Sequence, residues 1–463
     1  MVQICIWYPA DNPENNLPMV FSEYNFPYPE DNRFIDFLSE IQNREIAYLQ
    51  RILQGDQAMV LDILNTDVGA VRDAPLADGK FPLIIYIPDA GHGISENFGL
   101  MEYLAERGFI VATVHSVGAY QPNPRENPVD LETLARDVEF AISSLKNLPE
   151  VDKNNMGLMG YGFGADVAML LRMRNYDINA LVCLDNIAAG YDRLELLNSN
   201  PFFNPGRVNV PILYITAEEE SGADAGLLDS LEFAPRYLLR FSPDSGLCIT
   251  EYNKFIAVKQ NQSGELSSIN KDSHGAVCLY TANFLEAYLK KNEKAKSYLT
   301  ANPADNNYDP ALLRVTYSPA KQAPPNEFQF MSIINNQGID TAVELYRKFK
   351  SDYPEHVFFQ EGTFNVMGYR NLQSGRVPEA LKIFELNADA YPNSANVWDS
   401  YGEACLTAGD YRKALENYRK ALEILPHDDT TPEALKAAIE NGAPQQIQRI
   451  EELLKQSESE ENQ

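Results

Sequence analysis

Between residues 81 and 300 the chain alternates short apolar runs with amphipathic segments, and this alternation limits the folds open to it more than any other feature. The apolar runs are Phe81–Pro88, Phe109–His115, Met156–Gly160, Ile178–Asp185, Val210–Thr216 and Tyr237–Phe241. The amphipathic segments are Asn97–Arg107, Asp130–Leu148, Ala165–Arg174 and Thr281–Lys290. Runs that are apolar on both faces are typical of parallel strands covered on both sides. The pattern predicts a doubly wound, mostly parallel α/β sheet with right-handed crossovers.

Residues 11–80 do not follow this alternation. A stretch rich in Pro and Asn comes first, and an amphipathic helix is predicted from about Arg33 to Leu53. Two interpretations stay open: the segment is a lid over a cleft, or it is an extra helix on the edge of the sheet.

Val2–Ala10 predicts a strand at the start of the sequence, and no signal peptide is visible. A native N-terminus that extends beyond Met1 is compatible with this pattern. We therefore expect a soluble protein that is cytoplasmic or, where a leader has been removed, periplasmic or exported.

The composition changes after residue 300. Residues 301–326 are rich in Pro, Asn and Ala, and they predict a linker between a first domain of residues 1–300 and a second, all-α domain. The second domain is expected to hold helical repeats over residues 327–428 and a capping helix with an acidic tail over residues 429–463.

The repeats have a fixed period. Phe364–Pro392 superposes on Trp398–Pro426 at an offset of 34 residues. The matched pairs are Gly368 and Gly402, Gly375 and Gly409, Ala380 and Ala414, Leu381 and Leu415, Phe384 and Tyr418, and Pro392 and Pro426. This is the period and residue pattern of tetratricopeptide (TPR) repeats, and Phe328–Pro354 reads as a divergent earlier repeat.

The charge of the chain excludes whole classes of partner. The sequence holds 38 Lys and Arg against 66 Asp and Glu, a net charge of −28. Such a surface repels the phosphate backbone of nucleic acids and anionic membrane surfaces. No apolar run approaches the ~20 residues that a membrane-spanning helix needs. The five cysteines have no CxxC pair and no His, Asp or Glu cluster has metal-ligand spacing, so no disulfide framework, metal or other cofactor is predicted.

The segment Met156–Ala165 (MGLMGYGFGA) predicts a short strand, a glycine-rich turn and a helix. This is the context of the G-x-S-x-G nucleophile elbow, in which a tight turn exposes the central side chain. Here the centre is Gly162, so the nucleophile position is vacant. A dinucleotide-binding G-x-G-x-x-G loop is disfavoured, because the glycine spacing differs and the segment comes too late in the chain.

Two further positions fit a hydrolase site. The loop Pro88–Gly93 follows the first strong strand, where α/β-hydrolases place backbone N–H groups of the oxyanion hole. Asp185 ends the strand after the elbow, where an acid would orient a catalytic histidine. His92 in the loop is interpreted as a polar wall of the cleft, with a part in catalysis as the alternative.

Residues 1–300 resemble the dienelactone hydrolase and platelet-activating-factor acetylhydrolase-like branch of the α/β-hydrolases. The stretches that carry the resemblance are Ile6–Ala10, Gly91–Asn97, Glu102–Phe109, the elbow, Leu184–Asp185 and Asn283–Lys290. Some bacterial members carry TPR units after the hydrolase domain, so the resemblance extends over nearly the whole chain. It implies an α/β-hydrolase fold and a ligand-binding site. The residues that this implies for the binding site are Gly91, His92, Gly93, Tyr161 and Phe163.

The catalytic base of the family is a His shortly after a late strand, ahead of a Thr/Ser-Asp pair. Tyr237–Phe241 resembles that strand, and Gly246 then stands where the His belongs. The nearest later histidine is His274. Two interpretations stay open: the base is lost together with the nucleophile, or His274 replaces it. Cys183, in a buried strand, is expected to be inert.

Two functions of different classes follow. In the first, the hydrolase domain has a degenerate triad, with Gly162 and Gly246 vacant and Asp185 kept, and it acts without catalysis as a scaffold or as a binder of a small acyl or lipid ligand. Its TPR groove would dock a peptide or protein partner. In the second, the chain is a carboxylic-ester hydrolase for short acyl or lipid esters that uses His274 and a nucleophile which the sequence does not reveal.

Overall fold

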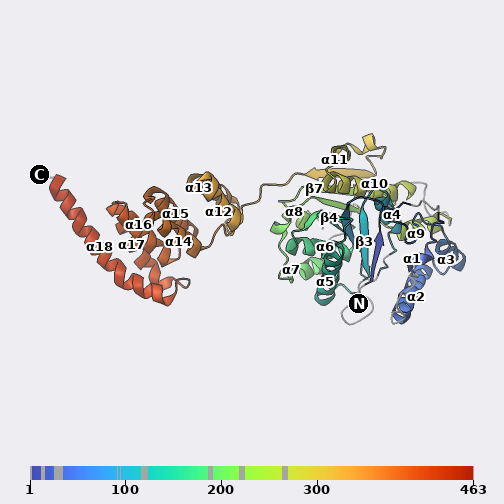
Figure 1. The fold of residues 1–463 in the computed structure, drawn as a ribbon, viewed down its shortest axis with the longest axis horizontal. Helices are drawn as coiled ribbons and strands as arrows, with labels where there is room; N and C mark the ends of the chain where they lie inside the picture. Colours follow the sequence, from blue (N-terminus) through green and yellow to red (C-terminus); the bar gives the residue numbers. More distant parts are fainter. Residues whose placement is uncertain are drawn as a thin grey trace. The chain divides into compact units, whose positions relative to one another are not determined.

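The computed structural model describes residues 3–11, 16–25, 35–90, 92–93, 95–115, 124–185, 191–217, 225–262 and 270–461. The chain divides into two compact units, Met1–Gln322 and Ala323–Gln463. Each unit has its own hydrophobic core. Figure 1 labels the elements of both units.

Within the described residues, the first unit is built on one eight-stranded sheet of order β1-β3-β2-β4-β5-β6-β7-β8. The strands are β1 (Gln3–Trp7), β2 (Phe81–Ile87), β3 (Ile110–His115), β4 (Val151–Tyr161), β5 (Ile178–Leu184), β6 (Ile212–Ala217), β7 (Arg236–Phe241) and β8 (Leu313–Ser318). The strands from β3 to β7 pair in parallel, whereas β1 and β8 are antiparallel to their neighbours at the two edges. The predicted mostly parallel sheet is confirmed.

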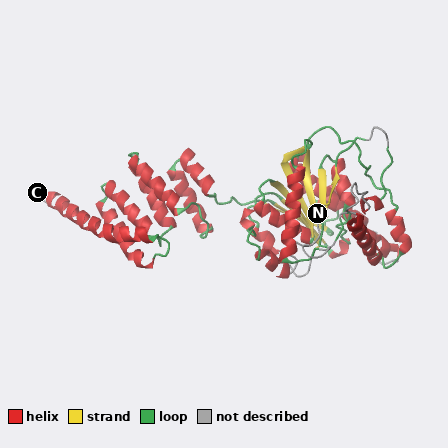
Figure 2. Ribbon diagram, turned by 60° about the horizontal axis from the view of Figure 1, so that its bottom comes forward, coloured by secondary structure: helices red, strands yellow, loops and turns green. Residues whose placement is uncertain are grey.

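Helices cover both faces of this sheet (Figure 2). The helices of the first unit are α1 (Ser22–Asn25), α2 (Ile35–Ile52), α3 (Gln57–Leu64), α4 (Phe98–Glu106), α5 (Pro128–Leu145), α6 (Phe163–Arg174), α7 (Tyr191–Asn198), α8 (Ala225–Ser230), α9 (Glu251–Gln262), α10 (Asn270–Leu289) and α11 (Glu293–Thr300). Helices α5 and α6 pack on one face, and α4, α10 and α11 pack on the other.

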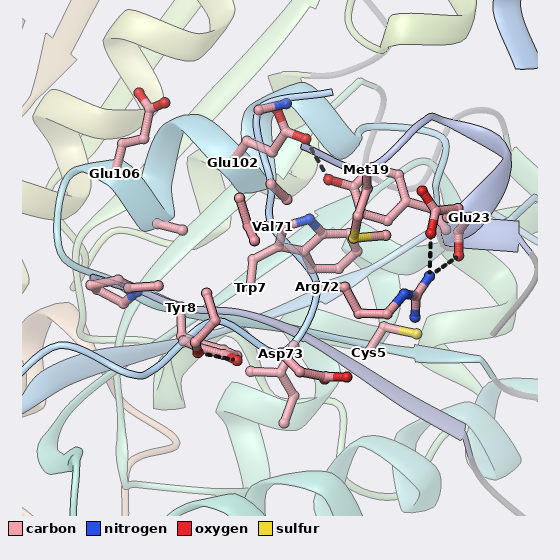
Figure 3. A pocket seen from close by; sticks show the side chains of 18 of the residues that line it. Cys5, Trp7, Tyr8, Met19, Glu23, Val71, Arg72, Asp73, Glu102 and Glu106 are labelled. Carbon is pink, nitrogen blue, oxygen red and sulfur yellow. Dashed lines mark hydrogen bonds and ion pairs between the residues drawn. The ribbon is translucent and has the colours of Figure 1, made fainter. Parts of the chain in front are cut away.

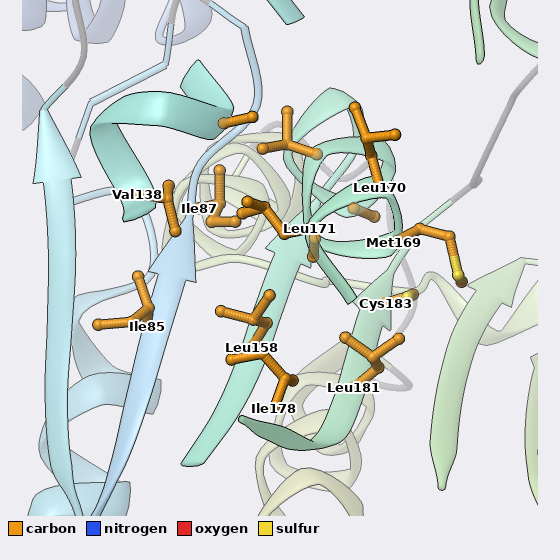
Figure 4. Packing of buried hydrophobic residues seen from close by; sticks show 14 of the residues in the cluster. Ile85, Ile87, Val138, Leu158, Met169, Leu170, Leu171, Ile178, Leu181 and Cys183 are labelled. Carbon is orange, nitrogen blue, oxygen red and sulfur yellow. The ribbon is translucent and has the colours of Figure 1, made fainter. Parts of the chain in front are cut away.

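The alternation along β2 shows how the sequence produces these layers. Leu83, Ile85 and Ile87 belong to the core under α5 and α6, whereas Ile84 and Tyr86 belong to the core under α4 and α10. Figure 4 shows the first of these cores from close by, with Ile85 and Ile87 of β2 labelled among its apolar side chains. A strand buried on both faces needs apolar residues at consecutive positions, which is the pattern that predicted it.

The prediction of a linker over residues 301–326 is wrong in its middle part. Strand β8 lies inside it and pairs with β7 from Arg236 opposite Ser318 to Phe241 opposite Leu313. The first unit therefore reaches Gln322 instead of residue 300. Along β8 only Leu313 is buried, so this edge strand lacks the apolar run that revealed the other strands.

The second unit consists of paired helices that follow the predicted period. Its helices are α12 (Glu327–Gln337), α13 (Ile339–Asp352), α14 (Glu361–Gln373), α15 (Val377–Ala390), α16 (Ala395–Thr407), α17 (Tyr411–Ile424) and α18 (Glu433–Glu461). The starts of α14 and α16, and those of α15 and α17, are each 34 residues apart. The matched small and large residues pack on each other within each repeat: a Cβ at Gly368 would lie 2.5 Å from the Phe384 ring, and one at Gly402 would lie 3.1 Å from the Tyr418 ring.

The contact between β2 and the start of α6 gives a direct test of the fold. A Cβ at Gly164 would lie 2.1 Å from the carbonyl oxygen of Ile87, so Gly164→Ala must push α6 away from β2. We expect this variant to lose about 3 kcal/mol of unfolding free energy, as for severe overpacking of a core. Urea unfolding followed by circular dichroism measures the loss.

A matched control is Gly275→Ala in α10 of the same unit, where a Cβ would meet nothing within 4 Å. This variant should gain about 0.5–1 kcal/mol through helix propensity. Equal stability of the two variants would contradict the tight contact at Gly164.

Candidate functional site

The backbone of a nucleophile elbow is present between β4 and α6. Gly162 adopts φ +54° and ψ −122°, and its N–H donates to the carbonyl oxygen of Leu184 at 3.0 Å. A Cβ at Gly160 would lie 2.3 Å from the carbonyl oxygen of Gly164. The three glycines therefore permit a turn that side chains would obstruct, and Gly162 takes a conformation that is strained for any residue with a Cβ.

The space beside Gly162 is filled by the side chain of Asp89, which follows β2. A Cβ at residue 162 would lie only 2.5 Å from Oδ1 and 2.6 Å from Cγ of Asp89. The same Oδ1 accepts a hydrogen bond from the backbone N–H of Phe163 at 2.7 Å. In α/β-hydrolases the N–H of the residue after the nucleophile is a donor of the oxyanion hole. In this chain a carboxylate of the protein already occupies that donor.

His92, three residues after Asp89, forms a pair with a buried carboxylate. Its Nδ1 lies 2.5 Å from Oε1 of Glu96, whose side chain is 1% exposed. Burial raises the pKa of Glu96 to about 7, although His92 opposes this shift. Burial lowers the pKa of His92, but the bond to Glu96 outweighs it, so the net shift is upward.

Helix α2 of the segment 11–80 contributes to the same region. The Glu45 carboxylate fills the space beside Gly93, where a Cβ would lie 1.7 Å from its Oε1. Oε2 of Glu45 accepts from the Tyr252 hydroxyl at 2.7 Å. The Tyr48 ring lies 5.1 Å from the His92 ring. The extra segment thus lies against the loop after β2; Gly91 of that loop is outside the described residues.

Asp185 follows β5 directly, next to the residue whose carbonyl pairs with Gly162. Its own N–H donates to Ile215, and the preceding carbonyl of Leu184 accepts from Gly162. Burial, with Glu96 and Asp185 nearby, raises the pKa of Tyr161. The Tyr161 ring is 6.1 Å from that of His92.

Phe163 serves the site in a different way from that expected. Its side chain is fully buried in the core under α5 and α6. Phe163 therefore contributes only its backbone N–H.

The two candidate positions for the base, Gly246 and His274, lie close to each other. Neither forms a hydrogen bond with Asp185. Gly246 has φ +59°, and its carbonyl accepts from the Ser273 hydroxyl at 3.1 Å. The next residue, His274, places Nδ1 3.2 Å from the carbonyl oxygen of Cys248 and Nε2 2.8 Å from Oε1 of Glu251. Burial opposes protonation of His274, but its hydrogen bonds to Cys278 and Glu251 raise its pKa to about 11. As an imidazolium with both N–H groups bonded, His274 has no lone pair to accept a proton.

Three residues of this region were not singled out from the sequence: Asp89, Glu96 and Glu251. The Thr250–Glu251 pair stands where the family has Thr/Ser-Asp, which was the available signal for Glu251. Asp89 comes directly after a buried strand. An acid at such a position is expected to lie at the carboxyl edge of the sheet. Nothing in the local sequence indicates which N–H it would reach.

A separate cavity of about 620 Å³ lies between β1, α4 and residues 69–77 (Figure 3). Trp7, Tyr8 and Tyr24 line it together with Arg72 and Glu102. Arg72 pairs with Glu23 at 3.4 Å, and Tyr24 donates to Glu102. The elbow residues do not line this cavity.

In the parts of the chain that the structure describes, no three His, Cys, Asp or Glu side chains are arranged to hold a metal ion. None of the helices in these parts has the length and apolarity needed to cross a membrane.

Two family models match parts of the chain. Residues 137–222, which include β4, the elbow and β5, match the family of the BAAT / acyl-CoA thioester hydrolase C terminal. Residues 395–428 match the tetratricopeptide repeat. A solved ferulic acid esterase from Streptomyces cinnamoneus is similar at 17% identity and a TM-score of 0.46, over 69% of this chain and 89% of that one. No curated protein matches. The α/β unit thus contains a segment similar to the acyl-CoA thioester hydrolase family, and the helical unit contains a match to the tetratricopeptide repeat.

The buried pair of His274 and Glu251 predicts a pH-dependent stability. The pKa of His274 is about 11 in the folded chain against 6.5 without the fold, so the pair stabilises fully below pH 6.5 and its contribution is lost as the pH rises toward 11. Glu251→Gln should therefore cost about 3 kcal/mol near pH 6.5, as for other broken buried pairs, and less at pH 9.5. Thermal unfolding between pH 6 and 9.5 measures the difference.

Lys146→Gln serves as the control, because it breaks the exposed Lys146–Asp177 pair, whose atoms are 3.5 Å apart. Surface pairs of this kind contribute little, so its melting temperature should follow that of the wild type at every pH. A Glu251→Gln penalty that is independent of pH would show that His274 is not held as an imidazolium.

Proposed function

We propose that the α/β-hydrolase domain does not catalyse serine-type ester hydrolysis and acts as a binding or scaffolding domain, while the TPR repeats dock a peptide or protein partner. The observation that carries the proposal is the Asp89 carboxylate. It fills the place of a nucleophile side chain and accepts from the Phe163 N–H.

The electrostatics of this arrangement oppose acyl transfer. A tetrahedral intermediate needs donors aimed at its developing negative charge. Here one such donor is bound to a carboxylate, which would repel an oxyanion at the same place. Loss of a catalytic Ser alone typically costs about 10⁶ in kcat. The missing side chain at Gly162 and the carboxylate of Asp89 both oppose the reaction of the family.

The alternative function is hydrolysis of a carboxylic ester or thioester, and the match of residues 137–222 to a thioester hydrolase family favours testing it. This alternative needs a base and a nucleophile. His274, its candidate base, bonds Glu251 and Cys248 instead of Asp185. Cys183, the cysteine of β5, is buried in the core, and burial raises the pKa of its thiol. These features favour the non-catalytic function.

The wild-type protein should hydrolyse p-nitrophenyl acetate and a short acyl-CoA thioester no faster than its Asp185→Asn variant. Both rates should equal the background, because neither protein has a nucleophile at the elbow. Rates are followed by the release of p-nitrophenol and of free thiol. Turnover that Asp185→Asn or His274→Gln abolishes would refute the proposal and establish the hydrolase.

A rescue series tests the geometry of the vacant site. Gly162→Ser alone should remain inactive and lose stability, since its Cβ would meet Asp89. Combining Gly162→Ser with Asp89→Ala clears that space and frees the Phe163 N–H. Adding Gly246→His supplies a base at a φ that His tolerates. The triple variant should exceed background by ~10²–10⁴, the usual contribution of a positioned general base.

The control for this series is the same triple variant with Asp185→Asn, which should lose most of the gain. If the Gly162→Ser and Asp89→Ala pair is already fully active and depends on His274, then Gly246 is not the base position. If the triple variant stays folded and inactive, the cleft has been remodelled beyond the three residues.

A further inference from the structure

The TPR unit contains a groove of about 520 Å³ between α16, α17 and α18. On the α16 side it is lined by Asp399 and Glu403, one helical turn apart, and on the α17 side by Tyr411 and Tyr418. The α18 side presents three small residues, Ala438, Gly442 and Ala443, together with longer ones farther along the helix, among them Gln446 and Arg449. The small residues opposite the acidic and aromatic wall leave room for a long side chain from outside.

Neither carboxylate of the acidic wall forms an ion pair within the described chain. Among the described residues, neither oxygen of Asp399 has a hydrogen-bond or ion-pair partner, and burial together with the nearby Glu403 raises the pKa of Asp399 to about 6. Glu403 accepts from the Tyr369 hydroxyl at 2.8 Å. Burial and the charge of Asp399 also raise the pKa of Tyr418. A half-buried carboxylate without a donor is costly, and a bound cation would remove that cost.

A second unsatisfied acceptor lies on the opposite wall. Oε1 of Gln446, on α18, is buried and has no hydrogen-bond partner within the described chain. Arg449 also lines the groove from α18, but it is exposed and forms no ion pair with Asp399 or Glu403. The groups of the groove without a protein partner, Asp399 and Oε1 of Gln446, are thus acceptors on both walls, which suits a ligand that brings donors.

From these observations we infer that the groove between α16, α17 and α18 binds the Lys or Arg side chain of a peptide segment of the partner. The inference rests on the proposed docking function of the repeats, and it names the chemical group of the partner that they recognise. The ammonium or guanidinium group donates to Asp399, Glu403 and Gln446, and its apolar stem lies against the faces of Tyr411 and Tyr418. An acidic peptide would meet two carboxylates and is excluded by charge.

The full-length chain is tested on an array of 12-residue peptides that share varied flanks and differ only at the central residue: Lys, Arg, norleucine or Glu. Peptides with Lys or Arg should be retained, and the best of them should bind at least tenfold more tightly than their norleucine versions in fluorescence anisotropy. The double variant Asp399→Asn with Glu403→Gln should remove this preference. Glu423→Gln, which changes an exposed carboxylate paired with Lys420, is the matched control and should keep it.

The outcomes separate the inference from the docking proposal. Binding with no preference for the central residue, or a preference that survives in the double variant, leaves docking intact and overturns the inference. Retention of no peptide at all contradicts both the docking function and the inference.

A pH series adds the stability of the TPR unit as a second readout beside peptide binding. Asp399 is faced by Glu403 on α16, Tyr369 on α14, Tyr418 on α17 and Arg449 on α18. Because its pKa is raised in the folded chain, the ionised form opposes folding above that pKa. Asp399→Asn should therefore raise the melting temperature of the TPR unit at pH 7.5 and weaken binding of the Lys peptide. Binding by the wild type should fall as the pH drops through 6. A variant that loses both stability and binding would mean that Asp399 has a structural role, and this would overturn the inference.

Discussion

The close approach of backbone to backbone at the elbow is the constraint on which the rest of the first unit depends. Gly164 lies against the carbonyl oxygen of Ile87, and Gly160 lies against Gly164, so β2, β4 and α6 are held at distances that no side chain permits. This contact fixes the N-terminus of α6 at the carboxyl edge of the sheet. The N–H of Phe163 and the end of β5 then meet at one point, where open α/β sheets place their binding sites.

The carboxylate of Asp89 stabilises the N-terminus of α6 at this edge of the sheet. The N-terminus of a helix carries a partial positive charge and unpaired N–H groups, and Asp89 satisfies one of them from the neighbouring strand. Asp89 thus takes the N–H that would face the oxyanion in the α/β-hydrolases which this region resembles. The turn keeps the tight backbone of an elbow, while this donor is already bonded within the protein.

The sequence predicted the elements whose residues repeat at a regular spacing along the chain. It did not predict the contacts that join residues far apart in the sequence. Apolar runs predicted the strands from β2 to β7, and the 34-residue offset predicted the helix pairs, because burial imposes those patterns on neighbouring residues. Strand β8 was missed, because an edge strand with one buried residue has no such pattern. Asp89 reaches an N–H 74 residues away, and His274 bonds a carboxylate 23 residues away. Such pairings arise from the topology of the sheet and leave no spacing to read.

Among the described residues, Asp166 and Asp428 differ from Asp399 in the partners that the fold supplies to each carboxylate. Asp166 has Arg193, and Asp428 accepts from the backbone of Ala395, Thr430 and Thr431, so the fold supplies what each charge needs. Burial opposes ionisation of Asp428, yet its hydrogen bonds keep the pKa of that carboxyl below the usual range. Asp399 has no such donors, and its pKa is raised. When a buried carboxylate without donors is ionised, it lowers the stability of the fold. Such a cost is understandable at a site whose donors come from another molecule.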